Sequence, residues 1–218
     1  LDSKFARTEG PVQDPEAARL AGLRAYGSGR LARYEEMRAK LQGIAPELRE
    51  LALQSYHKLL SYKDEYEVAR LLLATKTQVA ERFEGDYEIS YHLAPPLLAK
   101  TGPDGRPQKR SFGAWFDWIS QGLARLKFLR ETPFDPFGYS AERRMERQLL
   151  KDFESLVGRM MRNYDPERLD IWRELLGLPL NIRGFGPVKL TNAKAMQKRR
   201  EELLDQLTTG HASERSAA

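Results

Sequence analysis

The sequence predicts a mainly α-helical, bundle-like domain with one small β-hairpin near its middle, an α+β arrangement. Three observations carry this prediction. Leucine, methionine and aromatic residues recur at three- and four-residue spacing in several long segments, which is the period of an amphipathic helix. Residues 87–93 instead alternate apolar and polar side chains, as a half-buried strand does. A proline- and glycine-rich turn follows at residues 101–107.

The first 45 residues are expected to form an N-terminal arm or linker followed by a broken helix. Residues 1–15 are polar, carry two prolines and show no clear period. Residues 16–40 are rich in Ala, Arg and Glu, which favour helix, but three glycines interrupt them. We predict the break at residues 26–30 and place the start of the main domain at residue 46.

Two helices are predicted after Pro46, joined or continued by a charged segment at residues 61–67. The apolar face of the first consists of Leu48, Leu51, Ala52, Tyr56, Leu59 and Leu60. The face of the second consists of Val68, Leu71, Leu72, Thr75 and Val79. The hairpin strands are then expected near residues 87–93 and 108–112. Pro95 and Pro96 end the first strand, because proline lacks the amide hydrogen that a sheet requires.

The second half of the chain is expected to return to helices. The predicted apolar faces are Trp115, Ile119, Leu123 and Leu126 in residues 115–130; Met145, Leu149, Phe153, Leu156 and Met160 in the helix after residue 140; and Met196, Leu203, Leu204 and Leu207 in residues 193–207. Ser140 is a suitable cap for the middle one. A proline- and aromatic-rich loop occupies residues 132–139, and residues 169–176 can hold a short helix. The main domain ends at residue 207, and residues 208–218 are expected to be a disordered tail.

The composition excludes several kinds of chemistry. The chain has no cysteine, so disulfides, thiol nucleophiles and the usual ligands of iron–sulfur clusters are absent. Its three histidines are far apart and form no metal-binding spacing. No apolar stretch is long enough to cross a membrane. The chain starts at Leu1 without an apolar signal core, and we expect a cytoplasmic protein that is a processed product or a fragment.

Four segments resemble, in the same order, the carboxy-terminal region of the fused bacterial indolepyruvate ferredoxin oxidoreductases. They are residues 58–71 (KLLSYKDEYEVARL), 90–98 (SYHLAPPLL), 129–139 with 142–144 (LRETPFDPFGY and ERR) and 182–189 (IRGFGPVK). The resemblance spans most of residues 48–207. It implies a thiamine diphosphate- and iron–sulfur-dependent enzyme that oxidatively decarboxylates aryl 2-oxoacids to acyl-CoA.

The resemblance also implies that the cofactors are bound outside this chain. The Gly-Asp-Gly segment that holds Mg²⁺ and thiamine diphosphate in such enzymes is missing, since the nearest segment here is Gly85-Asp86-Tyr87. We therefore expect a structural or assembly domain that is not catalytic by itself. Thiamine diphosphate, Mg²⁺ and the iron–sulfur clusters would lie elsewhere in an oligomeric complex. Its partners would be the catalytic domains or subunits of the same enzyme and the electron acceptor ferredoxin.

The charged segment after the first predicted helix is the first candidate for an interface or ligand-contacting site. It contains Lys63, Asp64, Glu65, Tyr66 and Arg70. These residues could form a docking or substrate-entry surface. The alternative is an ordinary salt-bridged helix face, in which each residue pairs with the one four positions along.

Five further residues complete the candidate set. His92 lies on the predicted strand and is either a structural hydrogen-bonding residue or a ligand contact. Arg143 and Arg144 open a helix, where their charge opposes the helix dipole, so we expect acidic partners on another element or chain. Arg183 and Lys189 flank a glycine-containing segment that could hold an anion or form a tight turn facing a neighbouring domain.

Two other features have a functional and a structural interpretation. The Trp115-Phe116-Asp117-Trp118 segment is expected in the core or at an interface. The basic run that contains Lys194, Lys198, Arg199 and Arg200 could steer an acidic ferredoxin or be a solvated helix face. The alternative to the oxidoreductase reading is a stand-alone basic helical module that binds nucleic acid or protein. Against it, 31 acidic residues nearly balance 36 basic ones, and we expect no nucleic acid as a partner.

Overall fold

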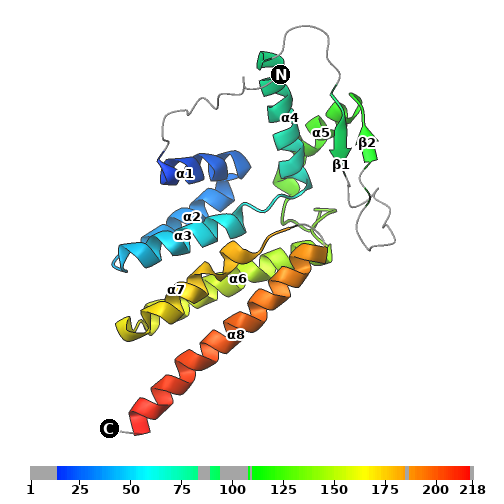
Figure 1. Cartoon of the computed structure of the whole chain (residues 1–218). Helices are drawn as coiled ribbons and strands as arrows, with labels where there is room; N and C mark the ends of the chain where they lie inside the picture. Colours follow the sequence, from blue (N-terminus) through cyan, green and yellow to red (C-terminus); the bar gives the residue numbers. More distant parts are fainter. Residues whose placement is uncertain (1–13, 83–88, 94–107, 109, 185–186, 217–218) are drawn as a thin grey trace, which may run out of the picture.

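The computed structural model describes residues 14–82, 89–93, 108, 110–184 and 187–216. They fold as mainly α with a two-stranded antiparallel sheet, which confirms the predicted fold class (Figure 1). In chain order the elements are α1 (Pro15–Tyr26), α2 (Ser28–Lys40), α3 (Pro46–Leu60), α4 (Glu65–Arg82), β1 (Tyr91–Leu93), β2 (Arg110–Phe112), α5 (Phe116–Arg125), the 3₁₀ turn η1 (Leu126–Leu129), α6 (Ala141–Arg162), η2 (Pro166–Arg168), α7 (Leu169–Gly177), η3 (Leu178–Asn181) and α8 (Pro187–Ser216).

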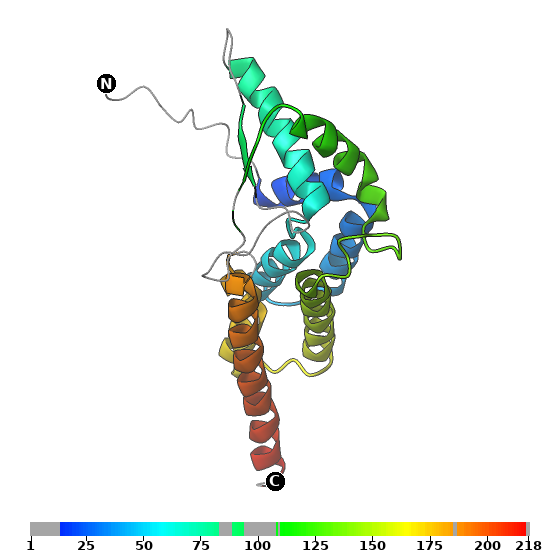
Figure 2. The same ribbon diagram turned by 90° about the vertical axis from the view of Figure 1, so that its right-hand side faces the viewer.

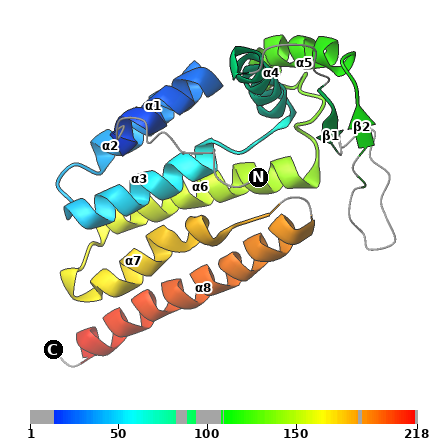
Figure 3. The same cartoon turned by 45° about the horizontal axis from the view of Figure 1, so that its top comes forward.

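Six helices, α1 to α3 and α6 to α8, share one hydrophobic core and form the body of the molecule. Figure 3 shows α3 lying beside α6, and α7 beside α8. Trp172 of α7 is fully buried, and Tyr56 of α3 stacks on Phe153 of α6 with ring centroids 6.0 Å apart. The predicted apolar faces of α3, α6 and α8 supply about half of the buried residues of this core. The short helix predicted near residue 169 is α7.

A smaller lobe, formed by α4, α5 and the two strands, stands at the end of the body opposite the free end of α8 (Figure 2). The strands pair in the register Tyr91 with Phe112, so the predicted hairpin partners are confirmed. Tyr91, Phe112 and Phe116 make a separate apolar cluster. Asp117 ties the lobe together, since it accepts a hydrogen bond from Tyr91 and pairs with Lys76 of α4. The predicted connecting turn and the prolines after Leu93 lie outside the described residues.

Local sequence signals explain the helix boundaries. Asp14 accepts a hydrogen bond from the Glu16 amide at the start of α1, and Pro15 occupies its first turn. Ser140 accepts one from the Arg143 amide at 3.2 Å, which confirms the predicted cap of α6. The break predicted between residues 26 and 30 is narrower than expected, because only Gly27 separates α1 from α2.

Helices α1 and α2, the broken helix predicted before residue 46, contribute Leu23, Tyr34 and Met37 to the main core and so pack within the body. Most of the predicted arm, residues 1–13, lies outside the described residues. The tail expected to be disordered from residue 208 continues α8 to Ser216. No proline follows Pro187 to stop the helix, and the Thr208 hydroxyl donates to the Leu204 carbonyl one turn back.

Two predicted apolar faces also differ from the structure. On α4, Thr75 is exposed and the other four predicted positions are only half-buried. On α5 the predicted inner face is largely the outer one. Trp115, Ile119 and Leu126 are exposed, whereas Phe116 and Asp117 point inward. The physical reason is that α5 has apolar residues on two sides, and periodicity alone cannot choose between them.

Among the described residues, no helix is both long and apolar enough to cross a membrane.

Candidate functional site

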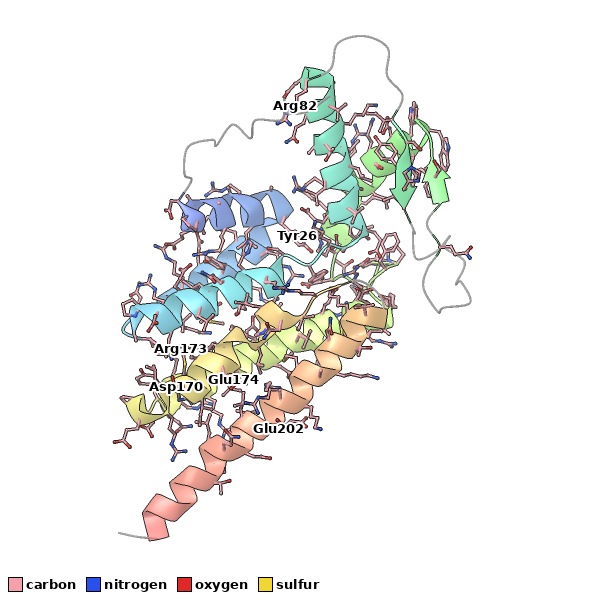
Figure 4. All side chains as sticks on the ribbon, in the orientation of Figure 1. Tyr26, Arg82, Asp170, Arg173, Glu174 and Glu202 are labelled. Carbon is pink, nitrogen blue, oxygen red and sulfur yellow. The ribbon has the colours of Figure 1, made fainter. Side chains whose placement is uncertain are left out.

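The base of α4 meets α1, α6 and the loop of residues 126–140 in a dense group of charged and tyrosine side chains. We call this group the junction cluster. It consists of Tyr26, Arg30, Tyr62, Asp64, Glu65, Tyr66, Arg130, Glu131, Asp135, Arg143, Glu146 and Lys189. Figure 4 labels Tyr26, which lies at the end of α1 that faces the base of α4.

Asp64 is the central carboxylate of the junction cluster and is almost completely buried. It caps α4 by accepting a hydrogen bond from the Glu67 amide at 2.7 Å. Arg130 binds both of its oxygens, and the Tyr26 hydroxyl donates to it at 3.1 Å. The Arg130 guanidinium also lies 3.8 Å from the centre of the Tyr26 ring and donates to the Tyr26 carbonyl. One carboxylate therefore connects α4, α1 and the loop before α6.

Arg30 of α2 forms the second part of the cluster. Its guanidinium donates to the Tyr62 hydroxyl at 3.0 Å, pairs with Glu131 and lies over the Tyr62 ring at 5.0 Å. Glu131 has a φ of 63°, in the left-handed region that residues other than glycine seldom adopt. Its amide donates to Asp135, and its side chain holds Arg30. These contacts hold the chain in that conformation as it enters the loop.

Asp135 organises the loop itself. It accepts hydrogen bonds from the amides of Glu131 and Phe137 and from the Tyr66 hydroxyl at 3.0 Å. The Tyr66 ring packs edge-on against Phe137, with centroids 5.4 Å apart. The loop is therefore attached to α4, and its outward-facing Phe134 is 80 % exposed.

Arg143 and Glu146 of α6 form the third part. Arg143 pairs with Glu146 and more weakly, at 3.6 Å, with Glu65 of α4. It also donates to the Lys63 carbonyl. Lys189 of α8 binds Glu146 from the other side. The expectation that Arg143 finds acids on another element is confirmed, although its strongest partner lies on its own helix.

Burial sets the protonation of the cluster. It raises the pKa of Tyr26 and Tyr66 far above the ordinary tyrosine value and that of Tyr62 to about 12. The phenols therefore remain neutral hydrogen-bond donors. Burial also raises the pKa of Glu65 and Glu146, while the adjacent Arg143 opposes this by favouring the ionised carboxylates. The arrangement is suited to fixing the relative positions of helices, because its acids are mostly engaged by donors from neighbouring elements.

The structure divides the predicted site residues into two groups. Asp64, Glu65, Tyr66, Arg143 and Lys189 come together in the junction cluster. The other five residues lie outside it: Lys63, Arg70, His92, Arg144 and Arg183. Four of these are exposed, and Arg70 is half-buried.

The predicted ladder of pairs four residues apart is wrong. Arg70 instead binds Glu67, three residues before it, through two hydrogen bonds of 2.7 and 2.9 Å. Tyr66, its predicted partner, points to Asp135. The cause is the helix start at Glu65, which turns Tyr66 and Glu67 toward the interior.

Arg183 and Lys189, near the start of α8, have a third cation close by, which is Lys58 of α3. Lys58 donates to the Leu180 carbonyl at 2.7 Å. Burial lowers the pKa of Lys58, and the charges of Arg183 and Lys189 lower it further. Gly184 has a φ of 94°, which agrees with the predicted tight turn.

The basic run on α8 is partly neutralised by neighbouring acids. Arg199 binds Glu174 of α7 at 2.6 Å, and Arg200 pairs with Asp152 of α6 at 3.4 Å. Figure 4 labels Glu174 and Glu202, the two acids that Arg199 contacts. Only Lys194 and Lys198 of the four predicted cations remain fully exposed.

The candidate set chosen from the sequence lacks seven members of the cluster, which are Tyr26, Arg30, Tyr62, Arg130, Glu131, Asp135 and Glu146. Two signals could have found part of it. Asp64 and Glu67 have the spacing of a helix capping box, and Asp135 before a proline is typical of a side-chain-capped turn. No local pattern links Tyr26 or Arg30 to residues that follow 30 to 100 positions later.

A small, partly open cavity of about 20 Å³ is lined by core residues that include Leu59, Phe153 and Met196. An open depression follows α6 from Lys151 to Arg162. Among the described residues, no group of three or more histidine, aspartate or glutamate side chains could hold a metal ion.

No curated protein and no solved structure matches the chain. A family model described as "Family of unknown function (DUF6537)" matches residues 13–202, a range that begins before α1 and contains the whole junction cluster. Because the match covers most of the 218 residues, the chain belongs to the DUF6537 family.

Proposed function

We propose that this chain is a structural and assembly domain of a cytoplasmic, thiamine diphosphate- and iron–sulfur-dependent 2-oxoacid ferredoxin oxidoreductase. The whole enzyme would convert an aryl 2-oxoacid such as indolepyruvate, coenzyme A and two oxidised ferredoxins into acyl-CoA, carbon dioxide, one proton and two reduced ferredoxins. The redox centres belong to other domains or subunits. The role of this chain is to fix contacts between parts of the complex.

The observation that supports this proposal is the convergence of three of the four segments that carry the family resemblance. The segment of residues 58–71 supplies Asp64, which binds Arg130 of the third segment. The third segment also supplies Arg143, whose partner Glu146 binds Lys189 of the fourth. Segments far apart in the sequence thus meet in one buried network. A network of this kind holds surface loops in fixed positions, which an assembly domain needs.

The nucleic-acid alternative has less support. Its main sequence feature was the basic run on α8, and two of those four cations are engaged by Glu174 and Asp152. The exposed cations that remain are scattered over several elements.

The proposal is tested by tagging the gene in its native host and purifying under gentle conditions whatever polypeptide or complex contains this sequence. We expect thiamine diphosphate and iron to copurify in fixed ratio to the chain. The purified material should also reduce a viologen dye when indolepyruvate and coenzyme A are both present. Recovery of the chain alone, or with nucleic acid and without iron, would contradict the proposal.

A further inference from the structure

The outer side of α5 and η1 carries an unusually apolar surface. Its members are Trp115, Trp118, Ile119, Leu126 and Phe128, which are 57, 84, 41, 41 and 70 % exposed. We call this surface the tryptophan face. The first four recur at helical spacing on one side of α5, while Phe116, Asp117 and Ser120 are buried on the other side.

The size of the face distinguishes it from scattered surface residues. From the areas of aromatic and aliphatic side chains, the exposed surface of these five side chains adds up to on the order of 600 Å². Monomeric proteins seldom expose a patch above that size, and a stable protein–protein interface buries roughly 800 Å² on each partner. The face alone therefore accounts for most of the area that one side of a specific interface needs.

The lobe beneath the face lacks a second covering layer. No residue of α4 beyond Ala69 is buried, although Leu71, Leu72 and Val79 are there and half-buried. The interior of the lobe consists of Tyr91, Phe112 and Phe116 with partly buried neighbours. A lobe of two three-residue strands and parts of two helices gains stability when a further apolar element packs on it.

The charges beside the face indicate which charges a partner element should carry. Residues 115–129 contain two exposed cations, Arg125 and Lys127. Asp117 is the single acid in this range; it is buried and paired with Lys76. Lys127 donates to the Ala25 carbonyl, which leaves its charge without a carboxylate in the described structure. Within residues 115–129, the exposed charges are thus both positive.

We propose that the tryptophan face docks an amphipathic helix of a partner protein whose apolar stripe is flanked by carboxylates. The face runs for 14 residues from Trp115 to Phe128, which corresponds to a partner helix of about four turns. This inference rests on the proposed assembly function, because it names the chemistry of the partner surface.

Other occupants fit the face less well. A second copy, related by a two-fold axis on the face itself, would offer no carboxylate to Arg125 and Lys127, because residues 115–129 contain no exposed acid. A membrane-binding helix carries a broad polar face rich in lysine and arginine, whereas the opposite side of α5 is packed against the lobe. Single-stranded nucleic acid could stack on the tryptophans, but it requires a continuous basic groove.

The test uses carbodiimide cross-linking of the complex purified from the native host. This reagent joins a lysine amine directly to a carboxylate that it contacts. We expect Lys127 to be linked to an aspartate or glutamate in a partner segment whose apolar residues recur every three or four positions. The exposed Lys194 of α8 serves as a lysine that should show no such link.

Matched variants show whether the face itself holds the partner. Trp118→Ser is expected to reduce the Lys127 link at least tenfold. Met161→Ser, which changes an exposed apolar residue on α6, should leave the link unchanged. Both positions are exposed, so both variants should keep the circular dichroism and melting temperature of the wild type. An unchanged Lys127 link in Trp118→Ser would overturn the inference.

Measurements on the isolated full chain test the other occupants. A dimer that Trp118→Ser abolishes in sedimentation experiments would overturn the inference in favour of a second copy. A blue shift of tryptophan fluorescence with anionic phosphatidylglycerol vesicles, measured in a Trp172→Phe background, would favour a membrane. Quenching by polyuridylate in the same background would favour nucleic acid. Absence of all three effects is the expected result.

The outcomes separate this inference from the proposed function. If iron and thiamine diphosphate copurify but Lys127 is linked only within this chain or to nothing, the docking inference fails and the proposed function stands. If Lys127 is linked to an acidic amphipathic segment of a protein without either cofactor, the proposed function fails and the inference stands. Recovery of the chain alone would overturn both.

Discussion

The Asp64→Asn substitution is expected to lower the free energy of unfolding by about 3 kcal/mol. Asparagine keeps the size of the side chain and remains a good helix cap, so the substitution removes mainly the charge. The side chains of Asp64 and Arg130 are only 3 and 8 % exposed, and the guanidinium would lose its counter-ion in the interior. Asp64→Ala also removes the cap of α4 and should cost about 1 kcal/mol more.

Urea denaturation followed by far-UV circular dichroism measures these differences. In a chain of 218 residues, a loss of about 3 kcal/mol should lower Tm by roughly 6–12 °C. The control is Glu174→Gln, which breaks the pair between Glu174 and Arg199. These two side chains are 44 and 43 % exposed, so the substitution should cost less than about 1 kcal/mol. A second change, Arg130→Met, should restore part of the stability of Asp64→Asn by removing the orphaned charge. If Asp64→Asn were no more destabilising than Glu174→Gln, the buried pair would contribute nothing beyond a surface pair, and the reasoning would be refuted.

Three further predictions follow from the structure. The fold is expected to lose stability as pH rises from about 10 to 12. The pKa of Tyr62 is raised to about 12 in the folded chain, whereas in the unfolded chain it has the ordinary tyrosine value near 10. Above pH 10 the unfolded chain therefore releases this proton first, which favours unfolding. Tyrosinate absorbance and circular dichroism should change together, and ionisation of the buried tyrosines well before unfolding would contradict this. Near neutral pH, Glu146→Gln should cost about 3 kcal/mol in urea denaturation, because it removes the closest carboxylate of buried Arg143 and half-buried Lys189 and leaves them only Glu65 at 3.6 Å and Glu142 at 3.7 Å. Glu65→Gln, which loses one weak contact and a buried charge, should cost less than about 1 kcal/mol. The opposite order would be inconsistent with the contacts. Gly184→Ala should lower Tm more than Gly43→Ala: both have positive φ, but only at Gly184 would the added Cβ meet a valine side chain of α8 at 2.8 Å.

Helices α3 and α6 of the body were predictable from periodicity because each has one apolar side. The stripe on α6 that ends at Met160 is buried almost throughout, and so is the stripe on α3 that begins at Leu48. Prediction failed on α5, where apolar residues lie on two sides and either side could face inward. The choice is made by Asp117, which is drawn inward by Tyr91 and Lys76 and so turns Trp118 outward.

The junction cluster was only half predictable, for a different physical reason. Helical spacing reports neighbours within one helix, and it therefore suggested partners four residues apart for Lys63 and Tyr66. The actual partners are set by tertiary structure: Tyr66 binds Asp135, which lies 69 positions later. Arg30 was placed outside the domain because the glycines around it weaken the helix signal, yet it is buried and paired with Glu131.

The junction cluster and the tryptophan face share one segment of the chain, residues 126–130. Arg130 directly follows η1 and binds Asp64. It is only two positions from Phe128 of the face. Because the ion pairs hold this segment against α1 and α4, the face is presented in one orientation before any partner arrives. A surface that is ordered in advance loses little conformational entropy on binding, which favours tight association. Weakening Asp64 should therefore reduce partner binding even where the fold survives, since the face would then have to be ordered during docking.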